Sequence, residues 1–359
     1  MPRRRGTSSA TSLNGMGTAE GGPRILITRL GAMGDVLHTL PAAADLRLRF
    51  PRGRIAWAVD SKWAPLLRGN PHIDEAISVP LGRWRRSKLA AATWSEISGF
   101  VREFRTAGFD LAFDFQGLLK SAICCSLSGA PVVIGFDRSL LRERASELLY
   151  DRRAPASSPH VVDRYRELAW FGSGRAPSSA AEFPLPRGDW SIPLPEHFVL
   201  GSPQAGWGSK QWPRSHYSAL ARTVWREHGM PLVADCPPGQ RACVEEIRAG
   251  APQGAVITHE STIPQLIAAT RRATAVVGVD SGPLHMATAL GKRGVAIFGP
   301  TDPLRNGPYG PSIAVIREPT ALTTYERSPR PSESMRACDP DLVYSQLRPL
   351  LTSVHSKHA

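Results

Sequence analysis

Short apolar runs alternate with longer amphipathic stretches along the first half of the chain, a pattern typical of strands alternating with helices. The apolar runs predict strands at 25–28, 55–59, 76–79, 111–115 and 132–136. Helical periodicity predicts helices at 36–50, 95–107, 117–127 and 142–149. This alternation favours right-handed βαβ units and therefore a parallel sheet.

The same alternation restarts after a stretch rich in proline, serine and glycine at 173–197. It predicts strands at 198–201, 231–234, 275–279 and 294–298, and helices at 214–228, 239–249, 262–271, 283–290 and 339–351. We therefore expect an α/β protein with two Rossmann-like domains, whose ligands bind at the carboxyl ends of the strands in an interdomain cleft. The expected boundaries are a tail at 1–22, an N-terminal domain at 23–180, a linker at 181–197, a C-terminal domain at 198–335 and a closing helix and tail at 336–359.

Composition and charge exclude several classes of protein. The 359 residues are 42 % hydrophobic and 21 % charged, as in an ordinary globular protein, and no apolar run approaches the ~18 residues of a membrane-spanning helix. The formal net charge of +13 favours partners that carry phosphates or anionic surfaces. Nucleic acid is not expected as a partner, because the chain has no zinc-finger spacing, no RNP-like strand and no basic zipper.

The cysteines and the N-terminal residues point to the compartment. The five cysteines form no CxxC pair and no Cys/His ligand spacing, which indicates a reducing compartment and no structural zinc. Residues 1–22 contain no apolar segment of a signal peptide, so we interpret them as a disordered tail, with Met16 as an alternative start. The expected localisation is cytoplasmic.

A first candidate site is the turn Gly31–Asp35, between a predicted strand and a predicted helix. Asp35 has two interpretations: a common N-terminal helix cap, or a carboxylate placed to take a proton from a substrate hydroxyl. The turn lacks the GxGxxG fingerprint, which disfavours a nicotinamide-dependent oxidoreductase.

Two further candidate sites lie in the second half. The glycine-lined turn Gly206–Pro213 carries Lys210, which is suited to phosphate, although an ordinary surface loop is the alternative. In the segment Val279–His285 a strand ends at Asp280 and a helix begins at Ser281-Gly282, so that backbone N–H groups form an anion site within reach of His285. The alternative is a helix cap followed by a partly buried histidine. The turn Gly206–Pro213 lacks the Walker pattern, so ATP hydrolysis is not indicated.

These motifs carry a resemblance to a known family. Thr28–Pro41 resembles the opening motif of the lipopolysaccharide heptosyltransferases, and Asp114–Ala122 followed by Arg142-Glu143 is similar to their heptosyltransferase I branch. Gly206–Pro213, Val279–His285 and Phe298–Pro303 resemble the donor-domain motifs, and Met335–Cys338 resembles loosely a C-terminal cysteine motif. The similarity extends from about residue 24 to 350 in the same order.

The resemblance implies a GT-B fold and a metal-independent, inverting glycosyltransferase without a cofactor. Heptose would move from ADP-heptose to a Kdo residue of lipid A at the inner face of the cell membrane. Asp35 would be the general base, and Lys120 and Arg142 would contact the acceptor. The implied donor-binding residues are Lys210, Gln240, Asp280, Ser281, Gly282 and His285.

One position departs from the family pattern, and two alternatives to this function remain open. Gln240 stands where relatives often carry a glutamate, so an amide would have to bind the ribose hydroxyls. Heptosyltransferase II, or another transferase of the family with a different acceptor, is one alternative. A non-catalytic nucleotide-binding protein on the same scaffold is disfavoured by the joint presence of Asp35, Lys210 and Asp280.

The segment Arg83–Lys88 adds a basic candidate site after the strand predicted at 76–79. We expect Arg83, Arg85 and Arg86 to lie in a strand-to-helix loop, to bind the anionic acceptor, and to contact an anionic membrane surface. Trp84 would then rest at the level of the lipid headgroups. The alternative is a solvated basic loop with Trp84 packed on the domain.

Overall fold

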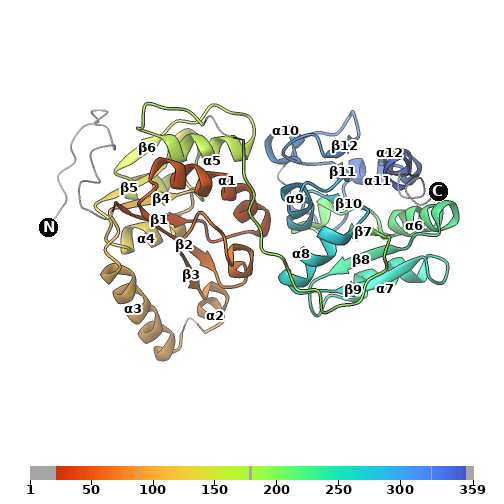
Figure 1. Cartoon of the computed structure of the whole chain (residues 1–359), viewed down its shortest axis with the longest axis horizontal. Helices are drawn as coiled ribbons and strands as arrows, with labels where there is room; N and C mark the ends of the chain where they lie inside the picture. The colour runs from red at the N-terminus through yellow and green to blue at the C-terminus, as the bar shows by residue number, and fades with distance from the viewer. Residues whose placement is uncertain (1–21, 88, 178–179, 325, 353–359) are drawn as a thin grey trace. The chain divides into compact units, whose positions relative to one another are not determined.

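The computed structural model describes residues 22–87, 89–177, 180–324 and 326–352. Two compact units divide the chain, the first ending at Pro184 and the second beginning at Leu185 (Figure 1). Each unit contains a six-stranded parallel sheet with helices packed around it. The expected α/β class is therefore confirmed. The expected tail at 1–22 lies almost wholly outside the described residues.

The first unit has the strand order β3-β2-β1-β4-β5-β6, so the chain starts in the middle of the sheet. Its strands are β1 (Arg24–Thr28), β2 (Arg54–Asp60), β3 (Glu75–Val79), β4 (Leu111–Asp114), β5 (Val132–Phe136) and β6 (Arg152–Ala154). Its helices are α1 (Met33–Arg49), α2 (Leu81–Arg86), α3 (Ala91–Thr106), α4 (Leu119–Leu127) and α5 (Val161–Trp170), with 3₁₀ turns at 64–67, 138–140 and 144–149. The sheet order reverses beside β1, and a reversal of this kind places the loops after β1 and β4 where ligands usually bind.

The second unit has the order β12-β11-β10-β7-β8-β9, which reverses between β7 and β10. Its strands are β7 (Val199–Ser202), β8 (Leu232–Cys236), β9 (Val256–Glu260), β10 (Ala275–Val279), β11 (Gly294–Phe298) and β12 (Ile313–Arg317). Its helices are α6 (Arg214–His228), α7 (Ala242–Ala249), α8 (Ile263–Arg272), α9 (Gly282–Ala289), α10 (Pro303–Asn306), α11 (Glu333–Ala337) and α12 (Pro340–Thr352). The buried residues of α12 join the core formed with α6 and the central strands. The predicted closing helix is therefore confirmed.

Several elements differ from the prediction. The helix predicted at 142–149 is a 3₁₀ segment over Arg144–Leu149. The helix α5 was not predicted; it packs along α1, where Arg166 forms a buried ion pair with Asp45 at 2.7 Å. The strands β6, β9 and β12, all at sheet edges, were also missed: β6 has only three residues, two of them arginines, and β9 ends in three polar residues.

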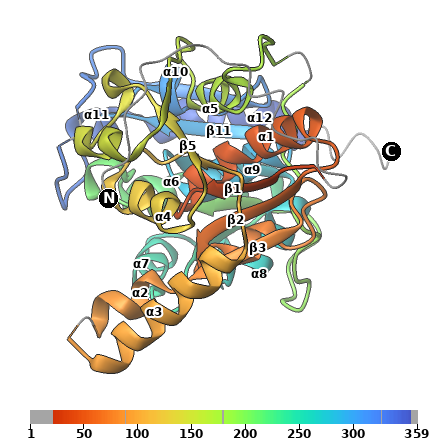
Figure 2. The same cartoon turned by 90° about the vertical axis from the view of Figure 1, so that its left-hand side faces the viewer.

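Helices α2 and α3 form a hairpin that extends from the edge of the first sheet, next to β3 (Figure 2). We call residues 81–106 the helical arm. The indole of Trp84 in α2 packs edge-on against Phe100 in α3, with ring centroids 5.6 Å apart. Phe100 in turn stacks on Phe104, which is buried. The Trp84–Phe100 contact joins the two helices, and an ion pair between Arg83 and Glu96 adds to it. Among the described residues, no helix is long and apolar enough to cross a membrane.

Candidate active site

Asp35 lies in the first turn of α1, directly after the loop that follows β1. One carboxylate oxygen, Oδ2, accepts a hydrogen bond from the N–H of Ala32 at 3.1 Å, so the side chain caps the helix. The other oxygen, Oδ1, forms an ion pair with Arg29 at 2.7 Å. The side chain is nevertheless 44 % exposed. Capping therefore does not preclude the proposed role, because the carboxylate remains partly exposed to solvent.

Arg29 is the partner of Asp35 that sequence reasoning missed. Its side chain is buried, donates to the backbone oxygen of Phe115, and lies over the ring of Tyr165. Burial by itself lowers the pKa of this guanidinium, but the charges of Asp35 and other neighbours outweigh burial and raise the pKa above its ordinary value. Arg29 is thus a permanent, immobile cation that orients the Asp35 carboxylate.

Asp114, at the end of β4, anchors the neighbouring loop. Its buried carboxylate accepts hydrogen bonds from the hydroxyls of Tyr150 at 2.7 Å and Ser121 at 2.9 Å, and from the N–H of Gln116 at 2.8 Å. Burial raises the pKa of Asp114, and these hydrogen bonds offset only part of that rise. The side chain of Gln116 then accepts from the N–H of Leu30 at 2.9 Å. These contacts tie the loop after β4 to the loop that carries Arg29.

The two predicted acceptor residues outside the arm are both exposed. Lys120 lies at the start of α4, and its pKa is lowered by partial burial and by the positive charge of Arg85. Asp60 and Glu143 act on Lys120 in the opposite direction. The structure thus brings Lys120 and Arg85 into one electrostatic environment. Arg142 is exposed between two 3₁₀ turns, and its role stays a prediction.

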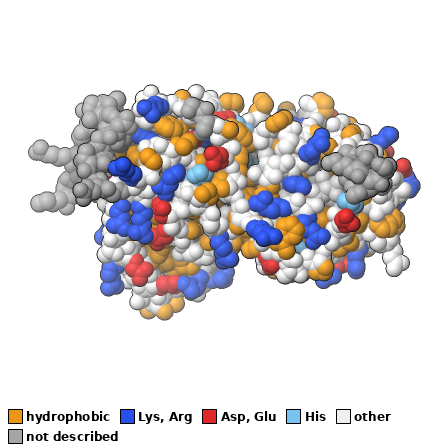
Figure 3. All heavy atoms as spheres, in the orientation of Figure 1, with side chains coloured by type: hydrophobic (Ala, Val, Ile, Leu, Met, Phe, Trp, Pro, Cys, Tyr) orange, Lys and Arg blue, Asp and Glu red, His pale blue; other side chains and the backbone are white. Residues whose placement is uncertain are grey.

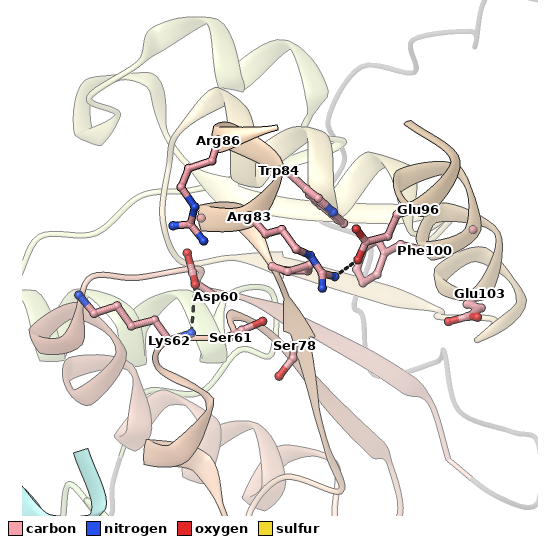
Figure 4. A pocket seen from close by; sticks show the side chains of 13 residues that line it. Asp60, Ser61, Lys62, Ser78, Arg83, Trp84, Arg86, Glu96, Phe100 and Glu103 are labelled. Atoms are coloured by element: carbon pink, nitrogen blue, oxygen red, sulfur yellow. Dashed lines mark hydrogen bonds and ion pairs between the residues drawn. The ribbon is translucent and has the colours of Figure 1, made fainter. Parts of the chain in front are cut away.

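A pocket of about 790 Å³ lies between the helical arm and the ends of β2 and β3 (Figure 4). Arg83 and Arg86 both line it, as do Lys62 and Asp60. Arg83 forms an ion pair with Glu96 of α3, which offsets its charge. The positive charges of Arg86 and Lys62 are therefore more available to an anionic ligand in this pocket than the charge of Arg83.

The expected loop at Arg83–Arg86 is wrong, because these residues belong to α2. The carbonyl of Pro80 accepts the N–H groups of both Arg83 and Trp84 at 3.1 Å, which starts a helix in a segment of good helix-forming residues. Trp84 is half-buried against Phe100, as in the alternative interpretation, rather than at an exposed surface. Lys88 lies outside the described residues.

In the second unit, three predicted residues form one cluster. The ammonium of Lys210, in the 3₁₀ turn after β7, lies 2.6 Å from Oδ2 of Asp280 at the end of β10. The imidazole Nε2 of His285 lies 3.3 Å from Oδ1 of the same carboxylate. Burial raises the pKa of Asp280, but the hydrogen bond with His285 and the charge of Lys210 outweigh it, so the pKa lies well below its ordinary value. Since that pKa is lowered, the ion pair stabilises the fold above about pH 4 and loses this effect only in strong acid.

The same cluster sits at the start of α9, as expected. Ser281 occupies the N-cap position, but its hydroxyl is buried and has no hydrogen-bond partner in the described part of the chain. Gly282 follows as the first helical residue, and the first-turn N–H groups of a helix have no partner within that helix. The buried hydroxyl of Thr301, after β11, is likewise unpartnered among the described residues. Such groups together suit phosphate oxygens.

Gln240 lies in the exposed turn after β8. The N–H of Gly239 in that turn donates to Oε1 of Glu260 at 2.6 Å. Glu260, at the end of β9, is a second residue that sequence reasoning missed, because β9 itself was not predicted. The proposed contact of Gln240 with ribose stays a prediction. Among the described residues, no group of three or more His, Cys, Asp or Glu side chains is placed to hold a metal ion.

The chain is similar in sequence to known glycosyltransferases. The model of glycosyltransferase family 9 (heptosyltransferase) matches residues 97–332. The chain is 30 % identical over 311 residues to lipopolysaccharide heptosyltransferase 1 of Escherichia coli, covering 82 % of this chain and 94 % of the relative. It is 29 % identical over 303 residues to lipopolysaccharide heptosyltransferase 1 of Pseudomonas aeruginosa, covering 80 % and 82 %.

Solved structures show the same fold. The structure titled E. coli heptosyltransferase WaaC with ADP has a TM-score of 0.77 at 24 % identity, covering 91 % of this chain and 99 % of that one. E. coli ADP-heptose lipopolysaccharide heptosyltransferase II has a TM-score of 0.75 at 23 % identity, covering 92 % and 99 %. The expected glycosyltransferase fold of two parallel-sheet domains is therefore confirmed.

Proposed function

The chain belongs to glycosyltransferase family 9, the heptosyltransferase family, and on this premise we propose that it transfers heptose from ADP-heptose to a Kdo residue of lipid A. The relatives named lipopolysaccharide heptosyltransferase 1 support this acceptor. The observation that carries the proposal is the Lys210–Asp280–His285 cluster at the start of α9. It combines a cation and helix amides for a diphosphate with a carboxylate for sugar hydroxyls.

On the acceptor side, Asp35 takes the proton from the attacking hydroxyl of Kdo. The hydroxyl oxygen forms a bond to the anomeric carbon of heptose from the face opposite ADP, so the reaction inverts the configuration. Arg29 holds the carboxylate oxygen Oδ1, and the lone pairs of Oδ2 that Ala32 leaves available receive the proton. The rigid Asp114 network keeps the neighbouring loop, and with it Arg29, in place.

On the donor side, negative charge develops on the leaving diphosphate as the glycosidic bond to ADP breaks. Lys210 supplies a positive charge, and the N–H groups at the start of α9 supply aligned dipoles. The hydroxyls of Ser281 and Thr301, buried without a partner in the described residues, supply further donors. Asp280 accepts from the hydroxyls of the heptose, held in its ionised form by Lys210 and His285.

The proposal is tested with purified protein, ADP-heptose and two defined acceptors. One is deacylated, water-soluble Kdo-lipid A, and the other is the same molecule already carrying one heptose. Mass spectrometry is expected to show one heptose added to the first acceptor. Addition to the heptosylated acceptor alone would instead assign the heptosyltransferase II activity, and release of ADP without any product would contradict transfer.

We expect EDTA to leave this activity unchanged. The charge on the leaving diphosphate is met by Lys210 and by helix amides, so the proposed mechanism has no step that needs a divalent cation. Initial rates are measured with and without EDTA after gel filtration. Activity that disappears with EDTA and returns with magnesium would contradict the donor-site assignment.

We also propose that the protein works at the anionic inner face of the cell membrane through basic residues of the arm. Replacing Arg83, Arg85 and Arg86 by serine is expected to raise the acceptor KM. The effect of each removed cation is about 1 kcal/mol, roughly fivefold in affinity. The effect of replacing Arg83 is expected to be the smallest of the three, because the ion pair with Glu96 already offsets its charge.

Steady-state kinetics with acylated acceptor in vesicles measures this change. The donor KM is expected to stay the same, because the donor cluster lies in the other unit. Arg52→Ser, which removes an exposed arginine just before β2, at the amino end of that strand, is the matched control. If the triple variant keeps the wild-type acceptor KM, the three arginines are only a solvated surface.

A further inference from the structure

The helical arm carries an exposed apolar tip. Residues 89–95, which join α2 to α3 and begin α3, contain no charged side chain. Leu89 is 91 % exposed and Trp94 is 62 % exposed, and the three alanines between them are exposed as well. Large apolar side chains gathered in this way at a projecting end mark an interaction surface more often than scattered single ones do.

The two helices of the arm are joined through the inner side of α3. Trp84 packs against Phe100, and Arg83 forms an ion pair with Glu96. The hydroxyl of Thr93, which is buried, donates to the backbone oxygen of Ser87 at 2.8 Å. Trp94 lies on α3 nearer the tip, while α2 has no buried residue at all. The large exposed surfaces of Leu89 and Trp94 therefore lie outside the buried face of α3.

The positive charge around the tip favours an anionic binding partner. Residues 81–106 contain six Lys or Arg residues against Glu96 and Glu103. Arg85 and Arg86 are exposed at the end of α2, beside the apolar tip. Figure 3 shows hydrophobic side chains at the lower end of the first unit, with Lys and Arg side chains next to them and some Asp or Glu side chains among these. A basic rim around exposed leucine and tryptophan suits an anionic lipid surface, where the apolar groups enter the bilayer boundary.

We propose that the helical arm is a membrane anchor whose tip, Leu89 and Trp94, inserts into an anionic lipid leaflet while Arg85 and Arg86 contact the headgroups. This inference deepens the proposed function, since the acylated acceptor lies in such a leaflet. The alternative binding partner of an exposed apolar tip is a second copy of this chain. Two arms with this excess of positive charge repel each other, whereas an anionic bilayer attracts them.

The experiment measures binding to vesicles of phosphatidylethanolamine and phosphatidylglycerol, with phosphatidylcholine vesicles for comparison. Wild-type protein is expected to bind the anionic vesicles and to be released by salt. The double variant Leu89→Ser/Trp94→Ser is expected to bind at least about tenfold more weakly, because two large apolar side chains no longer leave water. The double variant Leu48→Ser/Trp190→Ser removes an exposed leucine and tryptophan elsewhere and is expected to bind as wild type.

A second readout does not depend on affinity. Lipids with brominated acyl chains quench tryptophans that enter the bilayer, so they are expected to quench wild-type emission more than that of Trp94→Phe. Equal quenching, or equal vesicle binding of wild type and the Leu89→Ser/Trp94→Ser variant, would overturn the proposal. So would size-exclusion chromatography showing a wild-type dimer that this variant dissociates, because the tip would then bind a second copy.

Failure of this inference can be told apart from failure of the proposed transfer. Turnover on the deacylated, water-soluble acceptor needs no membrane, and the tip variant is expected to keep it at the wild-type level. If the Leu89→Ser/Trp94→Ser variant transfers heptose normally and also binds vesicles like wild type, the membrane-anchor hypothesis would be contradicted. The heptosyltransferase assignment would still stand. If the protein binds vesicles but transfers heptose to no acceptor, the anchor would stand and the heptosyltransferase assignment would be contradicted.

Discussion

Replacing Asp35 by alanine is expected to lower kcat by ~10²–10⁴, as for the loss of a general base. The structure adds a sharper variant, because Asp35 also caps α1 by accepting the N–H of Ala32. The amide oxygen in Asp35→Asn can still accept that hydrogen bond but cannot take a proton. Asp35→Asn is therefore expected to lose turnover like the alanine variant while its Tm falls less, because the amide keeps the cap although the buried Arg29 loses its ion-pair partner.

Single-turnover kinetics and calorimetric binding of ADP distinguish the two roles of Asp35. ADP affinity is expected to be unchanged, since the donor residues lie in the second unit. Asp339→Asn is the matched control, because Asp339 accepts the N–H of Asp341 at the start of α12 and takes no part in the proposed chemistry. A kcat near the wild-type value in Asp35→Asn would make Asp35 a helix cap and nothing more.

Lys210→Met is expected to lower kcat/KM for ADP-heptose by about one to two orders of magnitude, the effect of losing a charge-assisted contact worth ~1.5–3 kcal/mol. It also leaves the buried Asp280 carboxylate without its ammonium partner at 2.6 Å, so the variant is expected to lose stability. Asp280→Asn is expected to reduce donor use to a similar extent. Because the two side chains contact each other, their effects in the double variant will be smaller than the sum of the single effects.

Thermal unfolding of each variant separates lost stability from lost donor binding, and ADP titrations report the phosphate contact directly. Lys292→Met is the control, since Lys292 lies in the loop before β11 and donates to the backbone oxygen of Arg271. Strictly additive losses in Lys210→Met and Asp280→Asn would contradict a coupled pair. Unchanged ADP affinity in Lys210→Met would remove Lys210 from the phosphate site.

The sequence by itself determined the fold class and the long elements. Helix α6 and strands β10 and β11 have the bounds that the pattern predicted, because each has a clear periodicity and a glycine or proline at or next to an end. Helix α2 was taken for a loop because its six residues include three arginines and bury none of their side chains. Only the packing of Trp84 against α3 shows how this helix is held, and no local pattern contains that contact.

For the site, the sequence placed Asp35, Lys210 and Asp280 in loops that follow strands, since glycines and helix starts mark such loops in any α/β chain. It could not supply their partners. Lys210 reaches Asp280, 70 residues away, because the order of the second sheet places β7 beside β10. Strand order is decided by which buried faces pack together across the whole unit. Local periodicity predicts that a strand exists, but not which strand becomes its neighbour.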